Sequence, residues 1–352
     1  MKIGFTADAH LKAAHECPEW YNALVNVLDQ CRERGVEHLV IAGDLFDKTL
    51  QNYTDFEAIC KRPDFSNIKI HIIPGNHDPD IRQEHFSVGN IQLYTDPTWV
   101  EFDSDWSILF IPYVKGKSMG EIIEKYIKNN PSEKWVLVGH GDWSAGMRSP
   151  NPYEPGVYMP VTQKDITIYK PDYVILGHIH IPLDTTNLFY PGSPCGLDIT
   201  ETGYRRFLVL DTETNLIEPH RIQTDVVYFI EELLVLPADD EVQFIRNEIQ
   251  NSIKAWGLEE ADKTRVKLRV RCRGFCSNKA QLLDTITDSY KPYRFESDPD
   301  ISGVFIANDP ERDYLMEKVQ EKVDEIDWEA GPDEPGKSEI LLQAMHFIYG
   351  EK

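Results

Sequence analysis

The sequence predicts an α/β protein whose main domain is built on a mostly parallel sheet and is followed by a small α+β domain. Apolar, strand-like runs alternate with amphipathic stretches of helical period near the start of the chain. The length of 352 residues exceeds what one hydrophobic core usually serves, so a second domain is expected. We predict a main domain at residues 1–225, an α+β domain at 226–299, and an acidic linker with a terminal helix at 300–352.

The first part of the chain shows the clearest alternation of strand and helix. Strands are predicted at residues 1–8, 39–42 and 68–73. Between the first two, apolar residues recur at helical spacing from Trp20 to Cys31, and Gly35 is placed to end this helix. A weaker helix is expected within residues 53–62. The order strand, helix, strand implies parallel pairing.

After residue 98 the pattern changes. Residues 99–102 and 107–111 predict an antiparallel hairpin, where a mixed or second sheet begins. Further strands are expected at 135–138, 173–176, 188–190 and 206–210, and helices at 119–128 and at a segment that Thr162 and Asp165 would cap. Residues 142–160 predict a long loop, rich in Pro, Gly and Tyr, that is placed to rim a site.

The last third of the chain predicts the smaller domain and a tail. Strands at 226–236 and 266–272 and helices at 240–255 and 278–289 make the α+β domain. From Asp300 the chain is dense in acidic residues up to Glu334, and it is apolar again from Ile340 to Ile348. This pattern indicates a solvated linker that leads to an amphipathic terminal helix.

The composition limits the possible locations and partners. The net charge of −23 argues against general affinity for nucleic acid, but it does not exclude a nuclease, because carboxylates that hold cations count as negative. No apolar run is long enough to span a bilayer, and the start of the chain lacks the regions of a signal peptide. The six cysteines have no framework spacing. We therefore expect a cytoplasmic protein with reduced thiols and no membrane association.

Five predicted strands end in residues of the types that bind metals. The candidate ligands are Asp8, His10, Asp44, Asn76, His140, His178 and His180. Because ligands of open α/β sheets bind at the carboxyl ends of the strands, we expect these side chains to converge on one crevice. Seven nitrogen and oxygen ligands without a thiolate suit two borderline or hard divalent cations such as manganese, iron or zinc.

One carboxylate must be shared if seven residues hold two cations, and Asp44 is the expected bridge. The first cation would then be completed by Asp8, His10 and His180, and the second by Asn76, His140 and His178. Two dications and two carboxylates leave a charge of about +2, which suits an anionic phosphodiester. Hydrolysis of a phosphate ester is the chemistry that this arrangement favours.

His77 follows a candidate ligand but is not itself needed as one. We expect it to stabilise the transition state or protonate the leaving oxygen, with Asp78 orienting its ring. Asp47 is expected to support the site rather than bind a cation. Taken alone, each motif is more often a turn, or a surface or core histidine whose hydrogen bonds are already met, than part of a metal site. The agreement of five strand ends is what indicates a joint site.

These motifs resemble the signature of the calcineurin-like metallophosphoesterases. The matching segments are Asp8-Ala9-His10, Gly43-Asp44-Leu45-Phe46-Asp47, Gly75-Asn76-His77-Asp78, Gly139-His140 and Gly177-His178-Ile179-His180. The resemblance implies a β-sandwich flanked by helices, with a small α+β capping domain. It also implies that the seven ligands hold two manganese ions, with magnesium, iron or zinc as alternatives, and that His77 is the catalytic histidine.

Within that family the chain is most similar to the SbcD-type nuclease subunits of the double-strand-break repair complex, including phage relatives. The similarity lies in Gly43–Asp47, in Tyr190–Pro194 and in the domain order, whereas Ala9 and Lys12 replace the usual Trp and Gly of the first motif. It implies a DNA exonuclease and endonuclease that forms a homodimer. It also implies that the terminal helix docks on an SbcC-type ABC ATPase with long coiled coils.

A basic stripe is predicted on one strand of the smaller domain. Arg265, Lys267, Arg269, Arg271 and Arg273 alternate with apolar residues, so a strand would place all five cations on one face. One hypothesis is that the stripe follows a DNA backbone beside the cleft. The alternative is that it pairs with the acidic residues 309–334 or is simply solvated.

Two other functions are compatible with parts of the sequence. One is a phosphatase or phosphodiesterase that acts on a nucleotide, a protein or a lipid head group. Protein phosphatases of this superfamily place an Arg after the second Asp of the Gly-Asp motif. This chain has Lys48 at that position, which counts against a protein phosphatase. The other is a scaffold that keeps the fold without metal, and the intact ligand set argues against it.

Overall fold

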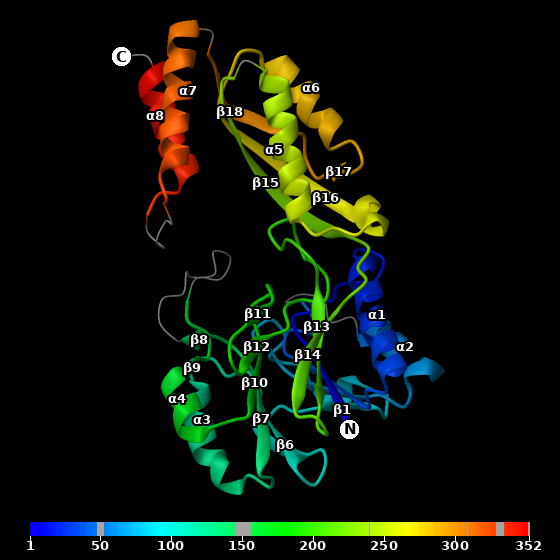
Figure 1. Ribbon diagram of the computed structural model, residues 1–352. Helices are drawn as coiled ribbons and strands as arrows, with labels where there is room; N and C mark the ends of the chain where they lie inside the picture. Colours follow the sequence, from blue (N-terminus) through cyan, green and yellow to red (C-terminus); the bar gives the residue numbers. More distant parts are fainter. Residues whose placement is uncertain (48–52, 145–155, 239, 308, 329–333, 351–352) are drawn as a thin grey trace. The chain divides into compact units, whose positions relative to one another are not determined.

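The structure is a computed structural model that describes residues 1–47, 53–144, 156–238, 240–307, 309–328 and 334–350 (Figure 1). The chain forms two compact units. The first comprises residues 1–197 and 204–226, and the second comprises residues 198–203 and 227–352. Lys48 and most of the predicted loop 142–160 lie outside the described residues.

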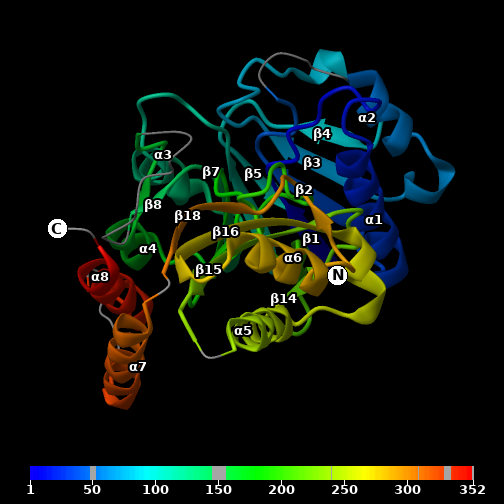
Figure 2. The ribbon, with the colours of Figure 1, turned by 90° about the horizontal axis from the view of Figure 1, so that it is seen from above.

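The first unit contains two six-stranded sheets with parallel centres. One sheet has the order β14 (Leu216–Arg221), β13 (Arg206–Asp211), β1 (Lys2–Thr6), β2 (His38–Ala42), β3 (Lys69–Ile73) and β4 (Ile91–Leu93). The other has the order β11 (Leu183–Asp184), β12 (Leu188–Tyr190), β10 (Tyr173–Gly177), β7 (Lys134–His140), β6 (Trp106–Ile111) and β5 (Thr98–Glu101). Strands β1 to β4 pair in parallel and lie side by side (Figure 2). The predicted hairpin is confirmed, because β5 pairs antiparallel to β6.

The two sheets face each other across one hydrophobic core. Phe5 and Val40 from the first sheet pack in the same buried cluster as Phe110, Val138 and Ile175 from the second. Burying a large apolar side chain contributes about 1.5–3 kcal/mol, so this layer holds the sheets together. The predicted fold class, an α/β sandwich with flanking helices, is confirmed.

Helices cover the outer faces of this sandwich (Figure 1). They are α1 (Pro18–Arg34) and α2 (Tyr53–Cys60) on the side of the first sheet, and α3 (Met119–Tyr126) and α4 (Gln163–Tyr169) on the side of the second. Helix α1 ends at Gly35, which is left-handed with a φ of 67°, as predicted. Thr162 accepts a hydrogen bond from the backbone N–H of Asp165 and so caps α4, also as predicted. Short elements complete the unit: β8 (Trp143–Ser144), β9 (Val161–Thr162), and 3₁₀ turns at Pro63–Phe65, Gln83–His85 and Ile127–Asn129.

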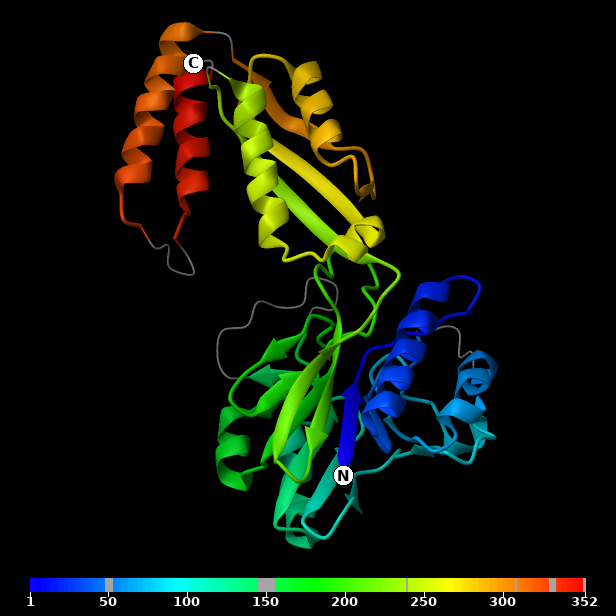
Figure 3. The same cartoon turned by 45° about the vertical axis from the view of Figure 1, so that its right-hand side comes forward.

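The second unit has a parallel sheet with helices on one face (Figures 1 and 3). Its strands are β15 (Val227–Val235), β16 (Val266–Cys276), β17 (Arg294–Phe295) and β18 (Asp300–Ile306), and its helices over the sheet are α5 (Glu241–Ala255) and α6 (Lys279–Ser289). A 3₁₀ helix, Glu260–Arg265, precedes β16. Trp256 stacks on Phe229 with ring centroids 4.4 Å apart, which ties the end of α5 to the sheet.

The acidic linker predicted from residue 300 is wrong over residues 300–325, whereas the terminal helix predicted after it is present. Residues 300–306 form strand β18, and two helices, α7 (Pro310–Glu325) and α8 (Lys337–Tyr349), lie side by side (Figure 3). Met316 of α7 and Met345 of α8 share a hydrophobic cluster with Phe275. Asp309 caps α7 by accepting from two backbone N–H groups, and Pro310 follows it, so a local helix start overrides the acidic composition.

Among the described residues, no helix has both the length and the apolar character needed to cross a membrane.

A buried histidine, His71, is paired with the half-buried His38 in the first unit. Nε2 of His71 is 2.8 Å from Nδ1 of His38, and its Nδ1 is 2.9 Å from the hydroxyl of Tyr94. His71 has an exposed fraction of 5%, and burial lowers its pKa to about 3. The folded state therefore favours the neutral imidazole.

We expect this histidine to make stability depend on pH. The unfolded chain takes up a proton on His71 near pH 6.5 and the folded chain only near pH 3, so stability present above pH 6.5 is lost as pH falls. Between pH 7.5 and pH 5, the free energy of unfolding should fall by about 2 kcal/mol more in the parent than in His71→Gln. Urea unfolding followed by tryptophan fluorescence measures this difference, and His15→Gln at an exposed position is the control. Parallel pH profiles of the parent and His71→Gln would contradict the assignment.

Candidate metal centre

The seven candidate ligands all follow strands that end at the same edge of the sandwich. Asp8 and His10 follow β1, Asp44 follows β2 and Asn76 follows β3, which are neighbours in the first sheet; His140 ends β7, and His178 and His180 follow β10, its neighbour in the second sheet. Each of the seven side chains has a nitrogen or oxygen atom within 3.9 Å of a candidate ligand from a different strand. Both sheets therefore contribute to one cluster, as the sequence predicts.

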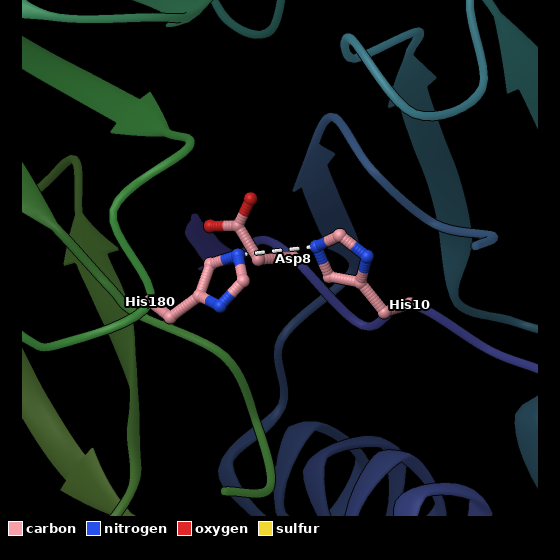
Figure 4. A group of neighbouring side chains, drawn as sticks. All are labelled: Asp8, His10 and His180. Carbon is pink, nitrogen blue, oxygen red and sulfur yellow. Dashed lines mark hydrogen bonds between the residues drawn. The ribbon is translucent and has the colours of Figure 1, made fainter. Parts of the chain in front are cut away.

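One side of the cluster is formed by Asp8, His10 and His180 (Figure 4). Each of these residues offers a ligand atom, and the three atoms lie within 4.8 Å of one another. Nε2 of His10 is 3.1 Å from Nε2 of His180. This is the trio predicted to complete the first cation.

The other side is formed by Asn76, His140 and His178. Oδ1 of Asn76 is 2.8 Å from Nε2 of His140 and 3.1 Å from Nδ1 of His178. One amide oxygen thus faces two imidazole nitrogens. This is the trio predicted to complete the second cation.

Asp44 lies between the two sides. Its Oδ2 is 3.6 Å from Nε2 of His10 and 3.2 Å from Nε2 of His140, which belong to different trios. Its Oδ1 accepts a hydrogen bond of 2.8 Å from the backbone N–H of His77. This is the position that the sequence predicts for a bridging carboxylate, and the backbone hydrogen bond fixes its orientation.

The donor atoms suit divalent cations. Nδ1 of His140 donates to the carbonyl of Ala42 at 2.9 Å, so its Nε2 directs a lone pair at oxygens of Asn76 and Asp44 unless a proton or cation lies between them. Within the described residues, Oδ2 of the fully buried Asp8 accepts no hydrogen bond. Converging lone pairs and an unsatisfied buried carboxylate oxygen need a positive charge, which is what a metal centre supplies.

The pKa values of the buried carboxyl and imidazole groups in the cluster also indicate that the site needs positive charge. Burial raises the pKa of Asp8 to about 6 and lowers that of His10 to about 3. Burial also opposes ionisation of His140 and Asp44, but their mutual attraction outweighs it, raising the pKa of His140 to about 9 and lowering that of Asp44. Divalent cations would supply this positive charge in a loaded centre.

The backbone of the cluster is strained. Asp8, His10, Asp44 and His178 have φ values of 54°, 46°, 51° and 92°. Such conformations cost on the order of 1–3 kcal/mol each for residues other than glycine, and they persist where the surrounding structure fixes them. Four of the seven predicted ligands carry this strain, and the surrounding structure holds them in it.

Gly177 is required by a close approach between the sheets. A Cβ on this residue would overlap the carbonyl oxygen of Ala42 and lie 2.7 Å from Nδ1 of His140. These are the two atoms that form the orienting hydrogen bond of His140. A side chain at this position would therefore displace the histidine.

Around His77 the structure differs from the predicted arrangement of carboxylates. Asp47, not Asp78, lies beside the ring, with its Oδ1 3.5 Å from Nδ1 of His77. Asp78 accepts hydrogen bonds from the backbone N–H groups of Gly75 at 2.8 Å and Phe46 at 3.2 Å. Asp78 thus joins two ligand-bearing loops, and burial raises its pKa to about 7.

Several buried polar residues that support the cluster were not predicted as site residues. Oδ1 of Asp142 is 3.8 Å from Nε2 of His178. Arg205, with an exposed fraction of 2%, donates to the carbonyl of His180 at 3.0 Å, and the backbone N–H of Ser193 donates to the same carbonyl at 3.0 Å. Of these residues, only Asp142 could have been suspected from the sequence, because it lies two residues after the candidate ligand His140. The others reach the site through tertiary packing.

The basic stripe lies on β16 in the second unit. Lys267, Arg271 and Arg273 are exposed and Arg269 is half-buried, while the alternating residues Val266, Leu268, Val270 and Cys272 are buried. Arg265 is the last residue of the preceding 3₁₀ helix.

Part of this charge is paired. Arg265 lies 3.3 Å from Asp262, Arg269 lies 3.1 Å from Glu296, and Arg273 lies 2.6 Å from Glu232. These partners lie outside residues 309–334, the segment considered as an alternative. Surface pairs of this kind contribute about 0–1 kcal/mol, so the arginines can exchange partners at little cost.

Comparison with known proteins defines the class of this site. Residues 1–182 match the model of the calcineurin-like phosphoesterases, and the chain belongs to that family. Members of the family bind divalent metals, in agreement with the candidate ligand groups described above.

The relatives include nucleases at moderate identity. SbcD, a subunit of the SbcCD nuclease of Staphylococcus epidermidis, is 28% identical over 255 residues, which are 61% of this chain and 67% of that protein. The DNA double-strand break repair protein Mre11 of Nanoarchaeum equitans is 23% identical over 248 residues, 59% of this chain and 66% of that protein. A solved archaeal phosphodiesterase matches 63% of this chain and 100% of its own, with 17% identity and a TM-score of 0.35.

We expect Gly177→Ala to damage the cluster without contacting a substrate. The added methyl group would break the hydrogen bond between Ala42 and His140, lowering the free energy of unfolding by about 2 kcal/mol or more and weakening divalent-metal binding. Thermal unfolding and Mn²⁺ titration measure the two effects. Gly89→Ala is the matched control, because a Cβ on this exposed glycine meets nothing within 4 Å. Equal thermal stability and equal Mn²⁺ affinity of Gly177→Ala and Gly89→Ala would argue against a close contact at Gly177.

Proposed function

We propose that this protein is a metal-dependent DNA nuclease of the SbcD type, which hydrolyses phosphodiester bonds in DNA repair, recombination or replication. The observation that carries the proposal is the placement of Asp44 between two trios of ligands, with His77 beside it. The names of the nuclease relatives support DNA as the substrate. The seven ligands and His77 are assigned their roles as part of this proposal.

Two divalent cations, most simply manganese with magnesium, iron or zinc as alternatives, would supply Lewis acidity and an activated water to an in-line displacement. The chain's own part is to fix their positions through Asp8, Asp44 and the five amide and imidazole ligands. Asp44 is held by the backbone N–H of His77, and His140 by the carbonyl of Ala42. This orientation by neighbouring groups keeps the ligands in place between turnovers.

His77 is assigned to the phosphate group. Its Nδ1 faces Asp47, so Nε2 is the nitrogen that we assign to a phosphoryl oxygen or to the leaving oxygen. The ring lies edge-on to His10 with centroids 4.5 Å apart, which places it next to the first trio. Neither Asp47 nor Asp78 is assigned to the substrate. Asp47 orients the ring of His77, and Asp78 holds the loop that carries it.

The basic stripe is proposed to contact the DNA backbone. Such contacts position a duplex and carry no sequence information. The exposure of Lys267, Arg271 and Arg273 on β16 supports this role, because the residues that alternate with them are buried and the three cations share one face of the strand.

An ATPase partner and a homodimer belong to the same proposal. The helix pair α7 and α8 exposes large apolar side chains, with exposed fractions of 63% for Tyr314, 51% for Leu315 and 87% for Phe347. Exposed apolar side chains of this kind support an interaction surface for an SbcC-type coiled-coil ATPase. A cytoplasmic location is supported by the six cysteines, each of which is a buried free thiol.

The nuclease proposal is tested with end-labelled duplex and single-stranded DNA in the presence of Mn²⁺ or Mg²⁺. We expect cleavage by the parent, none with EDTA, and a loss of about 10²–10⁴-fold in His77→Ala, the range for a lost proton-transfer group. His77→Ala should still bind the metals of the parent, since His77 is not assigned as a ligand. His15→Ala, at an exposed histidine, should retain activity.

The substrate class is decided in the same assay by a small chromogenic phosphodiester. Cleavage of the small ester without cleavage of any DNA would favour the alternative, a metallophosphoesterase that acts on a non-DNA phosphate ester. Full DNA cleavage by His77→Ala would contradict the role given to that residue.

The basic stripe is tested by the salt dependence of DNA binding. The double variant Lys267→Glu/Arg271→Glu should weaken binding and reduce the slope of log K against log salt by about 1 for each phosphate that the stripe no longer neutralises. Arg246→Glu/Lys254→Glu on α5 is the matched control, because it also reverses two exposed cations but lies outside the stripe. An unchanged slope in the double variant would show that the stripe does not contact DNA.

A further inference from the structure

A cavity of about 280 Å³ lies next to the candidate metal centre in the first unit. Its lining includes Pro74, Arg82, Asp96 and Tyr113. Pro74 is two residues before the ligand Asn76, and its carbonyl accepts a hydrogen bond of 3.1 Å from the backbone N–H of Tyr113. The cavity is therefore built on a loop that also carries a ligand.

Aromatic rings connect this cavity to the second trio of ligands. The ring of Tyr113 lies edge-on to that of His140 with centroids 6.3 Å apart. Tyr158 lies 6.2 Å from Tyr113 and 4.6 Å from His178 by the same measure. A group that extends from a phosphate at the metal centre along His140 would therefore reach Tyr113.

The charges of the lining indicate what the cavity can hold. Nη1 of Arg82 donates to the carbonyls of Pro79 at 3.1 Å and Ile81 at 2.8 Å, which fixes the guanidinium at the cavity. Asp96 supplies a carboxylate to the same lining. One cation and one anion leave little net charge, so a second phosphate gains little there. Sugar hydroxyls and the polar edge of a base can pair with both groups.

We propose that this cavity binds the nucleoside next to the scissile phosphate, with the base stacked on Tyr113 and its polar groups paired with Arg82 and Asp96. The volume is below the range of pockets for drug-sized ligands, as suits one nucleoside. The inference rests on the proposed nuclease function and adds a substrate class to it. A base in duplex DNA is already stacked on its neighbours, so the cavity selects a nucleotide that is unpaired or frayed at the point of cleavage.

The test compares esters that share a leaving group and differ only in the nucleoside. Methyl p-nitrophenyl phosphate lacks it, whereas the p-nitrophenyl phosphates of thymidine, esterified at the 5′ or the 3′ oxygen, carry it. The ratio of kcat/KM for a thymidine ester to that for the methyl ester measures the contribution of the nucleoside. We expect the parent to favour at least one thymidine ester, and Tyr113→Leu and Arg82→Gln each to reduce that ratio about tenfold.

Matched variants separate this role from a loss of folding. Tyr113→Phe keeps the ring and should keep the ratio, and dividing by kcat/KM for the methyl ester removes a general loss of folded enzyme from the comparison. Tyr169→Leu in α4 and Arg62→Gln, which lie outside the lining, should leave the ratio of the parent. A parent without preference for either thymidine ester, or an unchanged ratio in Tyr113→Leu, would overturn the inference.

The two proposals fail in different ways. A parent that cleaves no DNA with Mn²⁺ would refute the nuclease function whatever the ester ratios show. A parent that cleaves DNA, with ester ratios that the Tyr113 and Arg82 variants leave unchanged, would refute only the nucleoside cavity.

Discussion

The structure of the first unit depends on the need of two buried carboxylates for positive charge. Asp8 and Asp44 have exposed fractions of 0% and 1%, and both lie among imidazole nitrogens. Burying an ionised carboxylate is costly unless it is paired and hydrogen-bonded. The backbone N–H groups of His77 and His178 supply hydrogen bonds to these carboxylates, but they do not supply charge. Divalent cations held by the two trios would supply the missing positive charge.

The sandwich holds this arrangement with strained backbone and with close contacts between the loops that carry the ligands. Four ligand residues adopt positive φ, and Gly75 is needed because a Cβ there would overlap the side chain of Asp44. Segments far from the cluster in sequence also support it. Tyr190 donates to the carbonyl of Gly141 at 2.9 Å and accepts from the backbone N–H of Trp143 at 2.8 Å, which links the loop after β7 to β12. The centre is therefore a product of the whole fold rather than of its five motifs alone.

The sequence predicted the convergence of the seven candidate ligands because each follows a buried parallel strand, and parallel strands end at one edge. It could not predict which carboxylate faces His77. Asp47 and Asp78 are both near in sequence, and only the packing of two loops places the first at the ring and the second at the backbone. Helix α7 was missed because its surface is largely polar, so its apolar period is weak. Arg205 and Ser193 were missed because their contacts with His180 are purely tertiary.

The central claim is that the seven ligands form one centre for two cations with Asp44 as the bridge. Mn²⁺ ions about 3.5–4 Å apart that share a carboxylate give a spin-coupled electron paramagnetic resonance spectrum, whereas isolated ions do not. Metal-free protein titrated with Mn²⁺ should develop the coupled spectrum as the second equivalent binds, and Asp44→Asn should remove the coupling. Spectra of isolated ions at every loading of the parent, or saturation at one equivalent, would contradict the account.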